Sequence, residues 1–159
     1  MSGAKHTAPL PEPADLKRPV TIIDATGLVL GRMATHAAKR AILGDEVHIV
    51  NAEKAIIVGS SRRAIQEHYQ FKRGLGTDRK GPFFPREPHL LVKRTCRGMI
   101  NYQSSHGKAA YARIKAHLGV PKELAGQKAE TIPSAKRDAH SYLTVAELSS
   151  WLGRPTKEL

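Results

Sequence analysis

VTIIDATGLVLGRMATHAAKRAILGDEVHIV, residues 20–50, is the stretch of sequence that decides the fold. It opens with a short β-branched segment, which predicts a buried strand, and a tight turn at Gly27 follows. From Leu30 to Ala41 apolar residues recur at three- and four-residue spacing, as on one face of a helix, and Gly44 supplies the stop. Residues 46–51 predict a second strand. Strand, helix and strand in this order form a right-handed parallel crossover.

The strands of this unit are apolar on both sides. Residues 54–59 predict a third strand, or a continuation of the second after a bend, and residues 129–132 predict a last one. Parallel strands of this kind need cover on both faces. The sequence therefore predicts an α/β fold, a three-layer α/β/α sandwich around a small, mostly parallel sheet.

Helices are expected in the second half of the chain as well. A serine at 60 or 61 can cap a helix that runs to about Tyr69. Residues 89–100 predict a helix with basic residues opposite an apolar stripe of Val92, Cys96, Met99 and Ile100, and residues 107–118 predict another of the same kind. Thr144-x-x-Glu147 is a capping box that opens a last short helix.

Residues 71–88 interrupt this regular pattern. They include six Gly or Pro residues, together with Arg, Lys and Phe, and so predict a long irregular loop. A long irregular loop inside a compact domain usually serves a function.

The positive charge of the chain is concentrated around this loop. The 159 residues have a formal net charge of +12, and +10 of it falls on the 54 residues from 62 to 115. The same segment holds six of the eight aromatic residues. Basic groups neutralise phosphates and aromatic rings stack on unpaired bases, so this mixture favours folded RNA as a partner. A solvated basic face and an anionic membrane surface are the alternatives.

Several other classes of protein are disfavoured. The apolar runs are far shorter than the ~18 residues of a membrane span, and prolines occupy the place where an export signal would have its apolar core. The eight histidines are scattered without a metal-binding pattern, so we expect no metal. Cys96 lies in an apolar stripe and is expected to be a buried structural thiol, as suits a reducing cytosol.

The turn between the first strand and the helix offers an enzymatic alternative. Its glycines, Gly27 and Gly31, stand where nucleotide phosphates are often held, so a small α/β nucleotide-binding enzyme is the rival hypothesis. Their spacing fits neither a dinucleotide fingerprint nor a P-loop. We expect Gly31 to allow close helix packing instead, and Asp24 to cap or pair locally rather than to act as an acid or base.

Four ordered motifs over residues 20–121 make the chain resemble the ribosomal large-subunit protein L-thirteen family. The motifs are IDATG and LGRMA (residues 23–27 and 30–34), VNAEK (50–54) and RGMI (97–100). GPFFPR (81–86) and RTCRGM (94–99) are similar to the archaeal and eukaryotic branch. The resemblance implies a four-stranded parallel sheet between helices, binding to large-subunit ribosomal RNA, early assembly and no catalytic activity. After Met99 the chain departs from the usual Leu-Pro and Lys-rich loop, so no contacts are carried over from that loop.

We therefore expect a structural RNA-binding protein whose α/β core displays a basic loop and two basic-faced helices. The expected phosphate and sugar contacts are Arg79, Lys80 and Arg86 on the loop, Lys93, Arg94 and Arg97 on the first helix, and Lys108, Arg113 and Lys115 on the second. Phe83 and Phe84 either stack on bases or pack the loop against the core. Arg32, Lys39 and Arg40 are weaker candidates.

The expected organisation is a Pro-rich, extended arm at residues 1–19 and a single α/β domain at 20–159. The expected partners are large-subunit ribosomal RNA and neighbouring ribosomal proteins, in the cytoplasmic ribosome. We expect no cofactor, no small-molecule substrate and no membrane partner.

Overall fold

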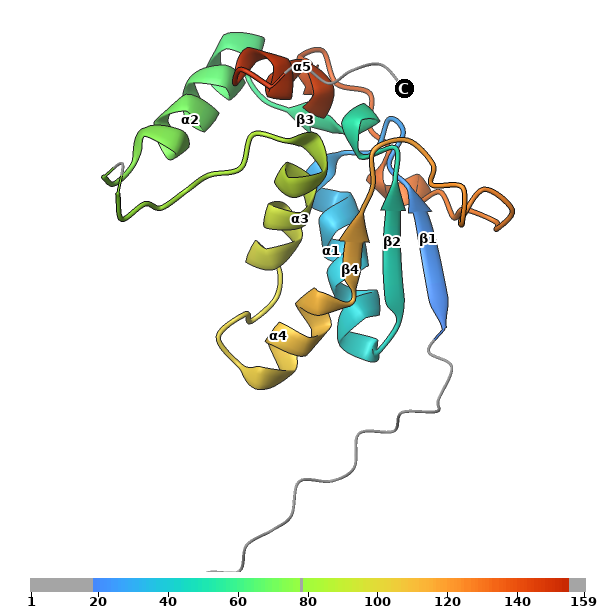
Figure 1. Ribbon diagram of the computed structural model, residues 1–159. Coiled ribbons are helices and arrows are strands. Elements are labelled where there is room, and N and C mark those ends of the chain that lie inside the picture. Colours follow the sequence, from blue (N-terminus) through green and yellow to red (C-terminus); the bar gives the residue numbers. More distant parts are fainter. Residues whose placement is uncertain (1–18, 78, 155–159) are drawn as a thin grey trace, which may run out of the picture.

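A small parallel sheet forms the centre of the computed structural model, which describes residues 19–77 and 79–154 (Figure 1). Its strands are β1 (Val20–Asp24), β2 (Glu46–Val50) and β4 (Ile114–Ala116), in the order β1-β2-β4. Both pairings are parallel, with Ile23 opposite Ile49 and Ile49 opposite Ala116. The predicted α/β fold with a small, mostly parallel sheet is confirmed.

Helix α1 (Leu30–Leu43) makes the predicted crossover from β1 to β2. Gly44 ends it in the left-handed conformation, with φ of 115°, and its N–H bonds back to the last turn. The residues that the apolar spacing placed on the inner face are buried: Leu30, Met33, Ala34, Ala37, Ala38 and Ala41. This small-residue face lets α1 lie close to α3 (Pro88–Gly98) and α4 (Ser105–Ala112), with which it shares one core.

The other side of the sheet is covered differently. Ile22 and Val50, which alternate with the core-facing Ile23 and Ile49, pack against Leu124 from the turns that follow β4. Glu130 adds a single parallel bridge to β1 at Ile23. Within the described ranges the sheet therefore has three strands and one bridging residue where four strands were expected, and irregular chain rather than a helix packs on Ile22 and Val50.

A second, two-stranded sheet lies beyond the carboxyl end of the first. β3 (Ile56–Val58) pairs antiparallel with β5 (Tyr142–Thr144), so residues 54–59 contain a separate strand and do not continue β2. The short 3₁₀ helix η1 (Ala52–Lys54) makes the bend between them, and η2 (Pro133–Ala135) precedes β5. Helix α5 (Val145–Trp151) begins at the predicted capping box, in which Thr144 and Glu147 bond to each other's backbone N–H.

Helix α2 (Arg62–Gly74) is capped by Ser61 as predicted but is longer than expected. It passes through Phe71, Lys72 and Arg73, which the sequence assigned to the irregular loop, and ends at the glycine. The residues before Gly74 are ordinary helix formers, so the helix continues to the first strong breaker.

The predicted helix at residues 107–118 is wrong in its second half. α4 ends at Ala112, and the chain turns directly into β4, where Ile114 is fully buried beside Val47. The apolar residues at 110, 111, 114 and 118 have a spacing that suits a helix, but the sheet edge takes Ile114 because it buries that side chain completely. Met99 also differs from expectation, since it is 45% exposed while Leu91 is buried in its place.

Residues 1–18, almost all of the predicted arm, lie outside the described residues, and the division into an arm and a single domain stays a prediction. Over the described ranges, no helix combines the length and apolar character required to cross a membrane.

Candidate nucleic-acid interface

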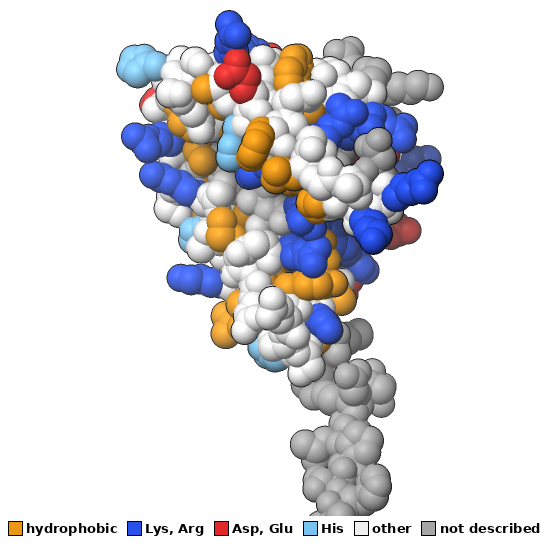
Figure 2. Space-filling view, turned by 90° about the vertical axis from the view of Figure 1, so that its left-hand side faces the viewer, with side chains coloured by type: hydrophobic (Ala, Val, Ile, Leu, Met, Phe, Trp, Pro, Cys, Tyr) orange, Lys and Arg blue, Asp and Glu red, His pale blue; other side chains and the backbone are white. Residues whose placement is uncertain are grey.

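Helices α2, α3 and α4 and the loop between α2 and α3 lie on one side of the molecule, and Lys and Arg side chains spread over that side (Figures 1 and 2). Most of these groups have no acidic partner. Among the described residues, no carboxylate forms an ion pair with the set that we call the unpaired basic face: Arg73, Arg79, Lys80, Arg86, Lys93, Arg94, Arg97 and Lys108. Seven of the nine basic residues predicted as contacts belong to it.

Aromatic rings contact two of the basic residues of α3. The guanidinium carbon of Arg97 lies 4.0 Å from the centre of the Tyr102 ring, and the Lys93 ammonium lies 5.2 Å from that of Tyr111. The two tyrosine rings meet edge to face at 5.2 Å. These cation–π contacts hold the two charged groups in place. Arg94 and Arg97 also border a cavity of about 430 Å³ beside Asn101 and Tyr102.

A narrow hairpin carries two of the three basic residues predicted on the loop. Thr77 and Gly81 pair through two backbone hydrogen bonds of 3.3 and 2.9 Å, and the Lys80 N–H donates to Thr77 Oγ1 at 3.2 Å. Arg79 and Lys80 lie at the exposed tip. The loop is therefore irregular, as predicted, but well bonded.

The two phenylalanines of this loop have different environments. Phe84 packs against the core and meets the Tyr69 ring edge to face, 5.8 Å away. Phe83 is 71% exposed. Of the two alternatives left open by the sequence, packing holds for Phe84, and Phe83 has a free face on which a base could stack.

Arg113 and Lys115 are not on a helix, in contrast to the expectation. Arg113 follows α4 and donates from Nη1 to the carbonyl oxygen of Ala41, at 3.0 Å, so it ties the start of β4 to the last turn of α1. Lys115 lies on β4 and pairs with Glu46 on β2, and its ammonium holds the pKa of that carboxyl below its usual range. Their role as RNA contacts stays a prediction, but both groups have partners within the protein.

Two of the three basic residues of α1 also have partners within the protein. Arg40 pairs with Asp45 and Glu130, at 3.6 and 3.8 Å, and Arg32 donates to the carbonyl oxygen of Ser134 at 3.2 Å. Of the three weaker candidates, Lys39 alone is exposed with neither an ion pair nor a side-chain hydrogen bond to a described residue.

Comparison with known proteins shows the family to which this chain belongs. A family model described as ribosomal protein L13 matches residues 18–123. The chain belongs to the ribosomal protein L13 family. The large ribosomal subunit protein uL13 of Archaeoglobus fulgidus is 44% identical over 137 residues, which are 84% of this chain and 87% of the relative. Proteins of the same name from Methanococcoides burtonii and Methanosarcina barkeri are 40% and 42% identical, over 84% of this chain and 98% of their own.

The resemblance seen in the sequence is thus confirmed, and L13-family membership makes the chain a ribosomal protein and not an enzyme. In the turn between β1 and α1, Asp24 has the local role that the sequence predicted. Asp24 accepts hydrogen bonds from the Thr26 N–H and hydroxyl and from the Asn51 amide. Burial would raise its pKa, but these bonds hold the pKa below its ordinary value. Asp24 therefore shapes the turn, as predicted.

Residues at the end of η2 contact the turn between β1 and α1. The Val29 N–H donates to the carbonyl oxygen of Ala135 at 2.9 Å, and Leu28 bridges to Lys136. Gly27 adopts a φ of 68°, so the tight turn is confirmed. The prediction of close packing at Gly31 is wrong, because a Cβ atom built there meets nothing within 4 Å.

Cys96 is the buried structural thiol that its position predicted. It is fully buried in the core, and burial raises its pKa to about 12. Among the described residues, no group of three or more His, Cys, Asp or Glu side chains could hold a metal ion.

Sequence reasoning missed two members of the surface. Arg73 was assigned to the loop without a role, and Tyr102 was not recognised as the ring beneath Arg97. The helix formers that precede Gly74 are the local signal that could have placed Arg73 on α2. The Arg97–Tyr102 contact has no local signal, since it depends on how the chain turns after α3.

Proposed function

We propose that this protein is a structural component of the large ribosomal subunit that binds ribosomal RNA through its unpaired basic face. Its relatives are named as large-ribosomal-subunit proteins, which supports the assignment to that subunit. The observation that supports RNA binding is that some basic residues form ion pairs with carboxylates and others do not. Arg40, Arg62, Arg63 and Lys115 pair with carboxylates of this chain, whereas the basic groups on the loop, α3 and α4 pair with no carboxylate of residues 19–77 and 79–154.

Unpaired basic groups that are held in place suit phosphate binding. A guanidinium can direct two parallel hydrogen bonds at one phosphate, and such charge-assisted bonds are stronger than neutral ones. Arg97 is positioned for this by Tyr102, so less side-chain freedom is lost when a phosphate binds. Arg79 and Lys80 are exposed at the hairpin tip, while the exposed Lys108 extends the surface onto α4.

The proposal includes an early place in subunit assembly, neighbouring ribosomal proteins as further partners and a location in cytoplasmic ribosomes. The family relationship and the reducing environment that suits the single free thiol support these parts. The protein itself would supply shape and charge and would catalyse no reaction.

The direct test measures binding of the purified chain to large-subunit ribosomal RNA across a salt series. Neutralising Z phosphates should give a log–log slope near −0.9Z for duplex contacts or about −0.7Z for single strands. Co-sedimentation with large subunits at moderate salt should accompany it, because contacts buried in the particle are screened less. An affinity that does not change with salt would rule out phosphate binding as its basis.

A further inference from the structure

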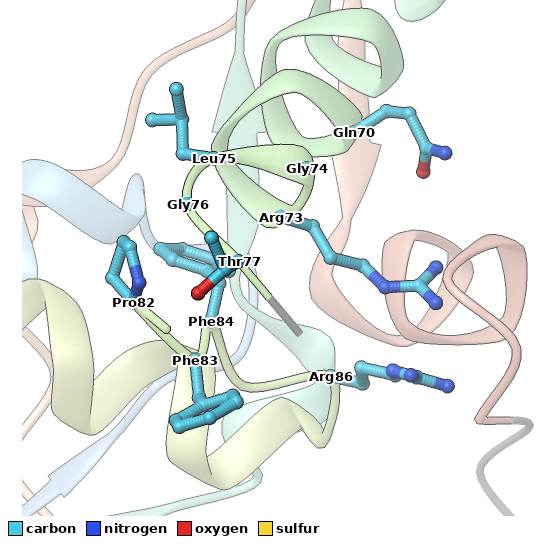
Figure 3. A pocket seen from close by; sticks show the side chains of 10 residues that line it. All are labelled: Gln70, Arg73, Gly74, Leu75, Gly76, Thr77, Pro82, Phe83, Phe84 and Arg86. Carbon is cyan, nitrogen blue, oxygen red and sulfur yellow. The ribbon is translucent and has the colours of Figure 1, made fainter. Parts of the chain in front are cut away.

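A cavity of about 550 Å³ lies between the last turn of α2 and the loop that leads to α3 (Figure 3). This volume falls within the range of about 300–1,000 Å³ that is typical of sites for small molecules and cofactors. It can hold one group of the size of a nucleotide but not a helical stem of RNA.

The walls of the cavity have two chemical characters. The side chains of Gln70, Arg73 and Arg86 extend to one side in Figure 3, and Leu75, Pro82 and Phe83 lie on the other. Among the described residues, the charged ones that line the cavity are both arginines, and neither pairs with a described carboxylate. The cavity therefore favours a ligand with an anionic part and a flat apolar part.

Contacts within the protein hold the frame of the cavity. Gly76 has a φ of 88°, and a Cβ atom there would lie 1.9 Å from the Gly81 carbonyl oxygen, so the two arms of the hairpin meet in direct backbone contact. Ser149 Oγ donates to the Arg86 carbonyl oxygen at 2.7 Å. With Phe84 packed on Tyr69, both ends of the segment from Gly81 to Arg86 are fixed. Phe83 is thus presented to solvent by a preorganised loop, and little ordering is needed for a ligand to bind.

We propose that this cavity receives a single unpaired nucleotide of RNA, with its base stacked on Phe83 and its phosphate held by Arg73 and Arg86. The inference rests on the proposed function and deepens it, since the ligand would be a looped-out nucleotide of ribosomal RNA. Every base offers a π face, so an exposed phenyl ring beside basic groups binds unpaired bases with little dependence on sequence. An acidic peptide would satisfy the arginines but would leave the 71% exposed Phe83 ring unused.

Two RNA hairpins with the same stem test the proposal on the full chain. One is fully paired, and the other carries a single bulged 2-aminopurine nucleotide, whose fluorescence falls when the base stacks. The wild-type chain should bind the bulged hairpin more tightly and quench it. Phe83→Ala should weaken binding to the bulged hairpin by about 5- to 100-fold and abolish quenching, with little effect on the paired hairpin.

The chain contains a matched control. Phe71 on α2 is 68% exposed and does not line the cavity, so Phe71→Ala should leave the preference for the bulge and the quenching unchanged. The double variant Arg73→Ala and Arg86→Ala should weaken binding of the bulged hairpin and flatten its salt slope by about the two contacts removed. Melting temperatures should stay near that of the wild type, because Phe71, Phe83 and Arg86 are exposed and Arg73 is only partly buried.

The possible outcomes separate this inference from the proposed function. If ribosomal RNA binds but the two hairpins bind equally and Phe83→Ala behaves as the wild type, the nucleotide cavity is overturned and RNA binding stands. If neither the hairpins nor ribosomal RNA bind, both proposals fail. If adenosine monophosphate binds as tightly as the bulged hairpin, the site belongs to a free nucleotide instead. If a polyglutamate peptide displaces the bulged hairpin from the wild type and from Phe83→Ala alike, but not from the double arginine variant, the site belongs to an acidic protein.

Discussion

The rings of His48 and His117 lie parallel to each other, with their centroids 5.3 Å apart and Nδ1 of His48 3.1 Å from Nε2 of His117. One nitrogen must donate a hydrogen and the other must accept it, so the contact requires that at least one ring is neutral. Burial lowers the pKa of His117 from its ordinary value of 6.5, and the neighbouring His48 lowers it further. The pair joins β2 to the chain that leaves β4.

This arrangement makes stability depend on pH. Because the folded pKa of His117 is lower than the unfolded one, the unfolded chain binds a proton more readily. Its stabilising contribution is therefore complete above the ordinary value of 6.5 and is lost as the pH falls from there toward the folded pKa. Urea unfolding between about pH 7.5 and 5 should show falling stability, and His117→Gln should flatten that dependence. His140→Gln, at an exposed position, should leave it unchanged, and equal slopes for His117→Gln and wild type would contradict the assignment.

Two glycines in helices should respond to the same substitution with opposite signs. A Cβ atom at Gly107 would lie 1.8 Å from the Asn101 carbonyl oxygen, so Gly107→Ala must displace backbone and should cost roughly 1–3 kcal/mol or more. Gly31 in α1 faces open space, so Gly31→Ala should stabilise the protein by about 0.5–1 kcal/mol. Thermal and urea unfolding of both variants test this. A loss of stability in Gly31→Ala would contradict this expectation and would support the close helix packing predicted from the sequence.

The capping box of α5 should make a measurable contribution to stability. Thr144 Oγ1 accepts from the Glu147 N–H at 3.2 Å, and the Glu147 carboxylate accepts from the Thr144 N–H at 2.9 Å. Thr144→Ala should cost about 1 kcal/mol of unfolding free energy, since it leaves an N–H at the helix start without a partner. Ser150→Ala, at an exposed position of the same helix, serves as the control. Similar losses in both variants would show that the cap is not the cause.

Position should outweigh net charge in RNA binding. Arg94→Ala with Arg97→Ala removes two positive charges that border one cavity, and Lys39→Ala with Arg137→Ala removes two from exposed positions elsewhere. The α3 pair should lose more affinity and flatten the salt slope by about the two contacts removed. Arg40 is a poorer control than Arg137 because its ion pairs with Asp45 and Glu130 support the fold.

Filter binding of both double variants across a salt series, with melting temperatures, makes the comparison. Equal losses would mean that the surface acts through bulk charge, and the assignment of α3 as an RNA contact would be wrong.

Local pattern in the sequence was enough for several parts of this protein. The β1–α1–β2 unit follows from β-branched segments on either side of a helical period, and the ends at Gly44 and Thr144 follow from residue types that suit caps. These features depend on residues within a turn or two of one another. The motifs over residues 20–121 likewise pointed to the family, because they need only order and spacing.

Tertiary structure alone decided the features that depend on distant partners. Ile114 has a helical neighbourhood in sequence, but pairing with Val47 buries it in the sheet and turns Lys115 toward Glu46. Phe83 and Phe84 are adjacent and alike in sequence, and only the position of Tyr69 makes one a core residue and leaves the other exposed. The sequence also did not predict which basic groups form ion pairs. An ion pair forms where the fold brings a carboxylate within reach, whatever the separation along the chain.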